Sequence, residues 1–77
     1  MMFALYENED GSESCFTLSS ASVTHPQLVN GLTKVWEVNA ESYVDAQIKF
    51  HEFMEWEPYQ VSGLEPTNEE LQQFASS

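Results

Sequence analysis

The stretch from residue 42 to residue 56 constrains the fold of this chain more than any other. Apolar side chains recur in it at helical spacing, so that at about 100° per residue they fall on one stripe. The stripe consists of Tyr43, Ala46, Phe50, Phe53 and Met54. Ser42 and Asp45 have the spacing of a helix capping box, and Pro58 should end the helix by about Trp56. We therefore predict one amphipathic helix whose apolar stripe needs a partner to pack against.

Three stretches with the period of a β-strand can provide that partner. Large apolar side chains recur at every second position over residues 3–7, 15–18 and 34–40, which suits strands with one face in the core. Residues 8–12 form a turn in which Gly11 accepts a positive φ, which predicts a β-hairpin with an acidic tip. The side chains expected to face the helix are Phe3, Leu5, Phe16, Leu18, Trp36 and Val38. The predicted fold is α+β: a small three-stranded antiparallel sheet in β-β-β-α order, with one amphipathic helix packed on it.

The link between the second and third strands carries weaker signals. Residues 19–24 are rich in small hydroxyl side chains, which predicts an irregular connector. A short helical turn should follow, with Thr24 as its cap, Pro26 near its start and Gly31 past its end.

The C-terminal part has one clear helix signal. Thr67 and Glu70 form a capping box that predicts a short helix over residues 68–75. Its inward side chains would be Leu71 and Phe74. We divide the chain into a single α+β domain over residues 1–61 and an acidic C-terminal tail or short helix over residues 62–77.

The net charge of the chain restricts the kinds of surface that it can bind. Thirteen acidic side chains oppose two lysines, which gives a formal net charge of −11 on 77 residues. Such a body repels nucleic acid and anionic membranes and is attracted to basic surfaces. Since 42% of the residues are apolar and 13% aromatic, the acids are carried by a fold rather than by a disordered tail. The expected partner is a basic protein surface, with no direct contact to nucleic acid or membrane.

The acids are grouped, and one group looks like an ordinary solvated helix face. Lys49 shares the polar side of the predicted helix with Asp45 and Glu52, at distances that allow ion pairs. The candidate surface is then the hairpin tip together with the acids that follow the helix, including Glu65, Glu69 and Glu70. The partner-binding residues we expect are Glu7, Glu9, Asp10, Glu13, Glu55, Trp56, Glu57 and Tyr59.

Residues 56–61 allow two interpretations. They are predicted to be extended, so that Trp56, Pro58 and Tyr59 either cover an edge of the core or add a short strand. Tryptophan and tyrosine are also enriched at binding hot spots, so the same rings could anchor a partner. Both interpretations stay open at the level of the sequence.

The sequence contains no motif that indicates a metal site, a cofactor site or a catalytic site. Asn8, Asp10 and Ser12 alternate as in a calcium loop, but the glycine is misplaced and no glutamate follows at the twelfth position. Two separate histidines make no zinc site. Cys15 is a single thiol among acids, which should raise its pKa. We expect no cofactor, no metal and no enzymatic activity, and the lone cysteine favours a reducing, cytoplasmic setting.

The central part of the chain resembles a group of small phage proteins. Residues 35–42 lead into residues 51–59, so that a strand, a capped helix and a terminal Trp-x-Pro-Tyr follow one another, as in short acidic proteins of phages and prophages. Residues after Val61 lie outside the resemblance. The resemblance implies a phage-type or mobile-element context and action in the host cytoplasm. Small acidic proteins of that kind often inhibit host defence nucleases, as anti-CRISPR and anti-restriction proteins do.

Two functions follow as hypotheses. In the first, a rigid array of carboxylates imitates nucleic-acid phosphates and occupies the basic groove of a nucleic-acid-handling protein, as a stoichiometric inhibitor. In the second, the acids mainly keep a small interaction or accessory module soluble. Its contact is then an apolar patch around Trp56 and Tyr59, with another protein or in a homodimer.

Overall fold

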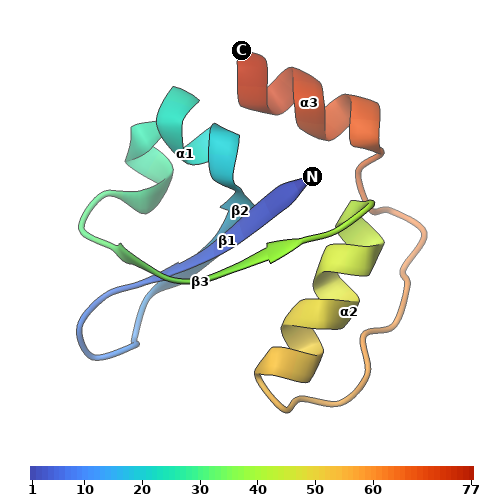
Figure 1. The fold of residues 1–77 in the computed structure, drawn as a ribbon, viewed down its shortest axis with the longest axis horizontal. Coiled ribbons are helices and arrows are strands. Elements are labelled where there is room, and N and C mark those ends of the chain that lie inside the picture. The colour runs from blue at the N-terminus through green and yellow to red at the C-terminus, as the bar shows by residue number, and fades with distance from the viewer.

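The computed structural model describes residues 1–77 and is built around a three-stranded antiparallel sheet (Figure 1). The strands are β1 (Met2–Glu7), β2 (Ser14–Leu18) and β3 (Thr33–Asn39), in the order β2-β1-β3. The helices are α1 (Ser19–Thr24), the 3-10 helix η1 (Pro26–Val29), α2 (Tyr43–Phe53) and α3 (Asn68–Ser76). The predicted α+β fold with its antiparallel sheet and C-terminal helix is confirmed.

The pairing of the strands sets the predicted core-facing side chains in two rows. The first row is Leu18, Phe3 and Val38, and the second is Phe16, Leu5 and Trp36. Phe3 and Leu5, on the central strand, are the largest fully buried side chains. The second row lies nearer the hairpin, because Leu5 stands two residues before the end of β1 at Glu7.

Helix α2 covers this face of the sheet, as its apolar stripe predicts. The amide of Asp45 donates to Ser42 Oγ (3.1 Å), and the Asp45 carboxylate accepts from the amide of Glu41 (3.1 Å). Ser42 is therefore the predicted N-cap, although Asp45 reaches one residue further back than in a capping box. The Phe50 ring stacks on Phe16 with centroids 4.4 Å apart.

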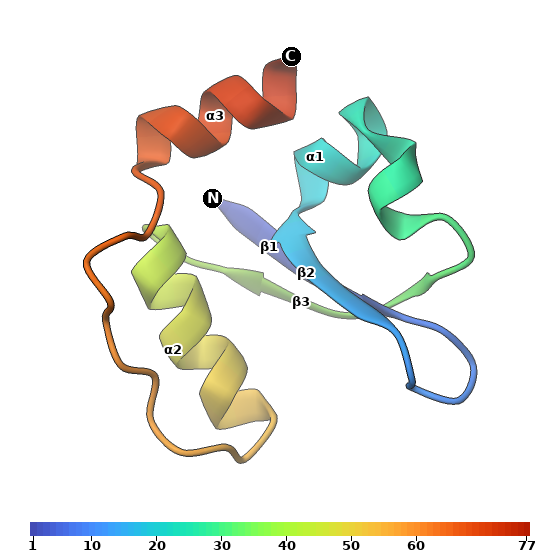
Figure 2. The same ribbon diagram turned by 180° about the vertical axis from the view of Figure 1, so that it is seen from behind.

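Residues 19–24 form helix α1, so the predicted irregular connector is wrong. Figures 1 and 2 show α1 and η1 on the side of the sheet opposite α2. Tyr6, which points to that side, shares a hydrogen bond of 2.8 Å with Ser22 Oγ, while Ser22 Oγ donates to Ser19 O. Ala21 is fully buried. Packing against the sheet thus overrides the poor helix propensity of a serine-rich segment.

The predicted short helical turn is present as η1, but Thr24 does not cap it. The residue at the N-cap is His25, and its side chain makes no capping bond. Thr24 Oγ1 instead donates to Ser20 O inside α1 (3.3 Å), because α1 extends through Thr24.

Helix α3 begins with the predicted capping box. The amide of Glu70 donates to Thr67 Oγ1 (3.2 Å), and the amide of Thr67 donates to Glu70 Oε1 (3.0 Å). The buried side chain is Ala75, whereas Phe74 is 44% exposed and stacks on His25 with centroids 4.7 Å apart. Since α3 packs into the same core as β1 and α1, the boundary expected at residue 61 does not separate it from the domain.

Alanine dominates the interior. Five of the eight buried residues are alanines: Ala4, Ala21, Ala40, Ala46 and Ala75. Small side chains let α1, α2 and α3 approach the sheet closely, but they contribute little apolar area to the core. Much of the remaining apolar mass lies at the surface, in partly exposed aromatic rings.

Candidate protein interface

Helix α2 ends in a motif that turns the chain back onto the helix. The amide of Glu55 donates to Glu52 O (3.2 Å) and the amide of Trp56 donates to His51 O (3.0 Å), which are the two bonds of a Schellman motif. Glu55 is its left-handed residue, with φ of 58°, and no other non-glycine residue has positive φ. The helix therefore ends at Phe53, earlier than the proline alone predicts.

Glycine at this left-handed position should stabilise the protein. A non-glycine residue in the left-handed region costs about 1 to 2 kcal/mol. We expect Glu55→Gly to raise the free energy of unfolding by about 1 kcal/mol, measured by urea titration. The matched control is Glu57→Gly, which removes the same charge where φ is not positive and should not stabilise. A lower stability for Glu55→Gly would contradict the assignment of strain.

The loop after α2 is held against the helix by His51. Nδ1 of His51 donates to the carbonyl oxygen of Glu57 (2.9 Å). The imidazole meets the Trp56 and Tyr59 rings edge-on, with centroid distances of 5.3 and 5.2 Å. The loop is thus irregular and folded back, not the additional strand that was one of the predicted alternatives.

Glu65 fixes the far end of this loop. Its carboxylate accepts hydrogen bonds from the Tyr59 hydroxyl, from the amide (2.7 Å) and hydroxyl (3.0 Å) of Ser62, and from the amide of Gly63 (2.9 Å). The bond from Tyr59, and next the amide of Ser62, lower the pKa of Glu65 to about 2. The same carboxylate raises the pKa of Tyr59 to about 12. We call this arrangement the Glu65 latch.

Stacked aromatic rings run from the core to the surface. Trp36 stacks on Phe53 with centroids 4.3 Å apart, and Phe50 meets Trp56 edge-on at 5.3 Å. Phe53 is 47% exposed and Trp56 52% exposed, while Trp36 is half-buried. We call Trp36, Phe53 and Trp56 the aromatic patch. Trp56 therefore fits both of its predicted roles, because it covers Phe50 and still presents half of its surface to solvent.

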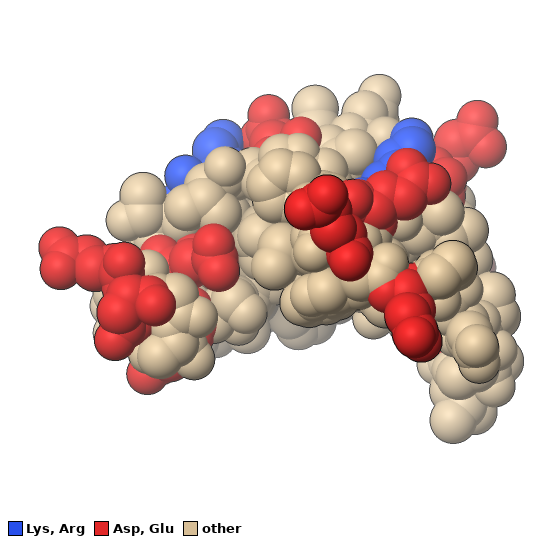
Figure 3. All heavy atoms as spheres, turned by 90° about the horizontal axis from the view of Figure 1, so that it is seen from below, with Lys and Arg blue, Asp and Glu red and all other residues tan.

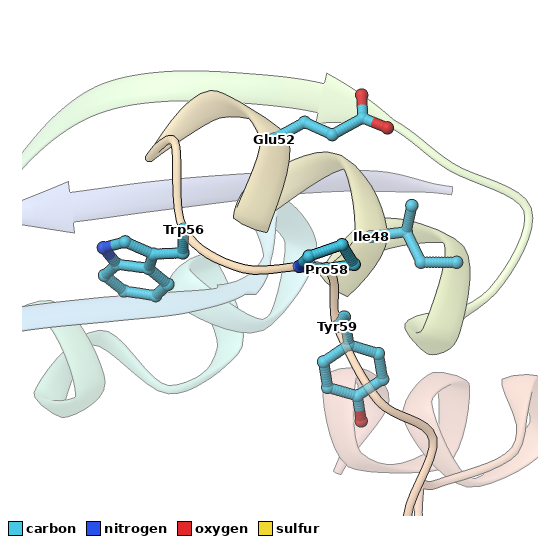
Figure 4. A pocket seen from close by; sticks show the side chains of 5 residues that line it. All are labelled: Ile48, Glu52, Trp56, Pro58 and Tyr59. Carbon is cyan, nitrogen blue, oxygen red and sulfur yellow. The ribbon is translucent and has the colours of Figure 1, made fainter.

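The folded-back loop and the outer side of α2 enclose a pocket of about 270 Å³ (Figure 4). Ile48 and Glu52 come from α2, and Trp56, Pro58 and Tyr59 come from the loop. We call it the α2 pocket. It is open to solvent and mainly apolar, with the Glu52 carboxylate as its charged group.

The hairpin tip has its own internal support. The Asn8 side chain accepts from the amide of Glu13 (3.1 Å), and Asp10 Oδ1 accepts from the amide of Ser12 (2.9 Å), which lowers the pKa of Asp10. These oxygens brace the turn. The carboxylates of Glu7, Glu9 and Glu13 accept no hydrogen bond.

The two acidic groups share one face of the molecule. Figure 3 views the protein from below Figure 1, and acidic side chains gather there over the hairpin and again over the end of α2, with uncharged atoms between. The hairpin cluster is Glu7, Glu9, Asp10 and Glu13, and the helix-end cluster is Glu52, Glu55 and Glu57. Trp36 of the aromatic patch pairs with Leu5, in the row of the sheet nearer the hairpin.

Other acids are engaged within the chain. Glu37 pairs with Lys34 (3.1 Å), and Asp45 pairs with Lys49 (3.3 Å). Glu65 and Glu70 serve the latch and the capping box. Of the predicted tail acids, Glu69 remains, at the start of α3 and away from the face in Figure 3.

One of the two predicted partners of Lys49 is wrong, and this affects the charge of the α2 pocket. It pairs with Asp45, as predicted, but its second bond goes to the carbonyl oxygen of Asn39 (2.8 Å) rather than to Glu52. The end of β3 lies closer to the lysine than the next helix turn does. Glu52 is therefore left without a positive partner, beside Trp56.

The structure brings some predicted site residues together and adds others. Glu55, Trp56, Glu57 and Tyr59 lie around the end of α2, and the four hairpin acids lie across the same face. Residues that the sequence reasoning missed are His51, which positions the loop, and Ile48 and Glu52, which line the α2 pocket together with the predicted group Trp56, Pro58 and Tyr59. Their only sequence signal was the Trp-x-Pro-Tyr that follows the helix.

Cys15 is half-buried on β2, and burial, rather than nearby acids, raises the pKa of its thiol. No group of three or more His, Cys, Asp or Glu side chains is placed to hold a metal ion.

No helix combines the length and apolar character that crossing a membrane requires. Comparison with protein-family models, with curated proteins and with solved structures gives no match to this chain.

Proposed function

We propose that this protein binds a basic surface of a nucleic-acid-handling protein and acts as a stoichiometric inhibitor. The observation that carries the proposal is the arrangement in Figure 3, where the hairpin cluster and the helix-end cluster share one face. None of the carboxylates of Glu9, Glu13 and Glu57 is paired with a lysine of the chain itself. Their charge is free to meet an outside partner.

Basic grooves suit such a face. Proteins that bind nucleic acids hold phosphates through lysine and arginine, so carboxylates fixed on a folded scaffold compete for the same side chains. Association is also accelerated by opposite net charges, here −11 on the side of this chain. The resemblance implies a phage context. Inhibition of a host defence nuclease would be one form of the proposed function.

A second candidate function has its own observation. Phe53 and Trp56 each expose about half of their surface, and exposed aromatic rings form hot spots in apolar interfaces. In this alternative the protein is an accessory module that binds through the aromatic patch, to another protein or to a second copy of itself.

Salt dependence separates the two functions. The tagged protein is incubated with a lysate of its natural host, and bound proteins are eluted with increasing salt and identified by mass spectrometry. Under the proposed function the captured protein is a nucleic-acid-binding protein. Its affinity falls by about tenfold or more between 50 and 200 mM salt, and a DNA or RNA fragment displaces it.

Charge-matched variants locate the binding face. Glu9→Gln with Glu13→Gln should weaken capture about tenfold, whereas Glu41→Gln with Glu69→Gln removes the same charge elsewhere and should weaken it much less. Circular dichroism checks that both variants are folded. Capture that survives high salt and is lost with Trp56→Ala would instead establish the apolar contact and refute charge mimicry.

A further inference from the structure

The α2 pocket has the chemistry of a receptor for one cationic side chain. Ile48 and Pro58 offer aliphatic walls, Trp56 and Tyr59 offer aromatic rings, and Glu52 offers a carboxylate (Figure 4). Aromatic rings attract cations that sit over their faces, and a carboxylate beside them adds a charge-assisted hydrogen bond. An anionic ligand would gain neither, and a neutral polar ligand would gain only the hydrogen bond.

Nothing in the chain itself competes for this role. The two lysines are held by Glu37 on β3, and by Asp45 and Asn39 at the other end of α2, and the chain has no arginine. Glu55 and Glu57 add negative charge next to the pocket. The occupant must therefore bring its own positive charge.

The volume limits the size of the occupant. At about 270 Å³ the pocket is smaller than the roughly 300 to 1,000 Å³ of sites for drug-sized ligands, so it suits a single long side chain. Between the two cationic side chains, the guanidinium is planar, stacks on rings and gives up its water more easily than an ammonium. Arginine thus matches the walls better than lysine.

We propose that the α2 pocket binds an arginine side chain of the partner protein. The proposal rests on the basic partner proposed above and names the contact that anchors it. The aliphatic stem lies along Ile48 and Pro58, and the guanidinium lies against an aromatic wall of the pocket. The Glu52 carboxylate, which points away from Trp56 and Tyr59 in Figure 4, turns toward the guanidinium on binding.

The receptor is assembled before the ligand arrives. His51 bonds the loop at Glu57 and contacts both aromatic rings of the pocket. The Glu65 latch holds the Tyr59 hydroxyl and so fixes the orientation of that ring. Because the loop and its side chains are already ordered, little conformational entropy is lost when the ligand binds.

The test uses the isolated 77-residue chain and a blocked tripeptide with arginine at its centre. Binding is followed by NMR through the indole N–H of Trp56, with the indole of Trp36, outside the pocket, as internal reference. We expect a saturable shift at Trp56 with a dissociation constant of about 1 to 10 mM, as for one anchored side chain. The citrulline tripeptide, which has the same shape without the charge, should bind at least fivefold more weakly.

Variants assign the contacts. Glu52→Gln should weaken the arginine tripeptide about fivefold, and Glu41→Gln, which removes the same charge at the far end of α2, less than twofold. For Trp56→Ala, binding of the arginine tripeptide is followed by the methyl shifts of Ile48, and the affinity should fall more than tenfold. Leu64→Ala, in the same loop, should leave the affinity unchanged. Leu64 is 90% exposed and does not line the pocket.

Three results would overturn the proposal. They are the absence of a saturable shift, equal binding of the citrulline tripeptide, and equal binding of the corresponding lysine tripeptide. Its failure is separable from failure of the proposed function. Salt-sensitive capture without tripeptide binding refutes only the arginine pocket, and tripeptide binding without a nucleic-acid-handling partner refutes only the proposed function.

Discussion

Replacing Phe3 with alanine should leave the protein largely unfolded in water at room temperature. Phe3 is 2% exposed at the centre of the sheet, between Leu18 and Val38 and beside the ring of Phe16. Truncation of a buried phenylalanine costs about 3 to 5 kcal/mol. A chain of 77 residues has about 4 to 12 kcal/mol of stability in total, and a small single core lies at the low end.

Urea titration followed by circular dichroism measures this loss. The control is Val23→Ala, which removes an 81% exposed side chain from α1 and should change the free energy of unfolding by no more than about 0.5 kcal/mol. A Phe3→Ala protein that loses less than about 1 kcal/mol would show that the core is organised around other residues.

Replacing Glu65 with glutamine should lower the pKa of Tyr59 from about 12 toward its ordinary value of 10, a change of up to about 100-fold in the ionisation constant. The hydrogen bond to the Glu65 carboxylate, and its negative charge, oppose ionisation of the phenol in the native protein. A neutral amide removes the charge and holds the phenolic proton less strongly.

Tyrosine absorbance followed against pH detects this change. In the native protein a component of the tyrosine absorbance should titrate near pH 12, and Tyr59→Phe should remove that component. Glu57→Gln, in the same loop but not bonded to Tyr59, should leave it in place. A native protein without that component near pH 12 would contradict the Glu65 latch.

The latch also predicts where stability depends on pH. The folded-state pKa of Glu65 lies below its ordinary 4.5, so its stabilisation is present above about pH 4.5 and lost as the pH falls toward 2. The folded-state pKa of Tyr59 lies above 10, so its stabilisation is present below about pH 10 and lost as the pH rises toward 12. Unfolding of Glu65→Gln should depend less on pH in both windows.

The sequence predicted correctly those helices and strands that have a clear local pattern. Alternation located the three strands, and the Thr67 capping box located α3. Helix α1 was missed because Ser20 and Ser22 disfavour a helix in isolation, and it forms when Ala21 is buried against the sheet. Propensity cannot express such a long-range contact.

Only some of the residues of the candidate interface could be predicted from the sequence, and not their arrangement. The acids and Trp56 were identified, but not the left-handed Glu55 that turns the loop back, because that position ordinarily takes glycine. Glu52 belongs to a helix row that looks solvated, and it lines a pocket because the loop with Trp56, Pro58 and Tyr59 folds back beside it. Whether two acidic groups share a face depends on the path of the whole chain, which periodicity does not contain.

The alanine-rich core has a consequence for the lifetime of the protein in a cell. With little apolar area inside, the fold has a small reserve of stability, and a partner that covers Phe53 and Trp56 adds to it. At a partner concentration 100 times the dissociation constant this addition is about 2.7 kcal/mol. Under the proposed function, unbound copies would unfold more often and be degraded first, so the amount of protein would follow the amount of its partner.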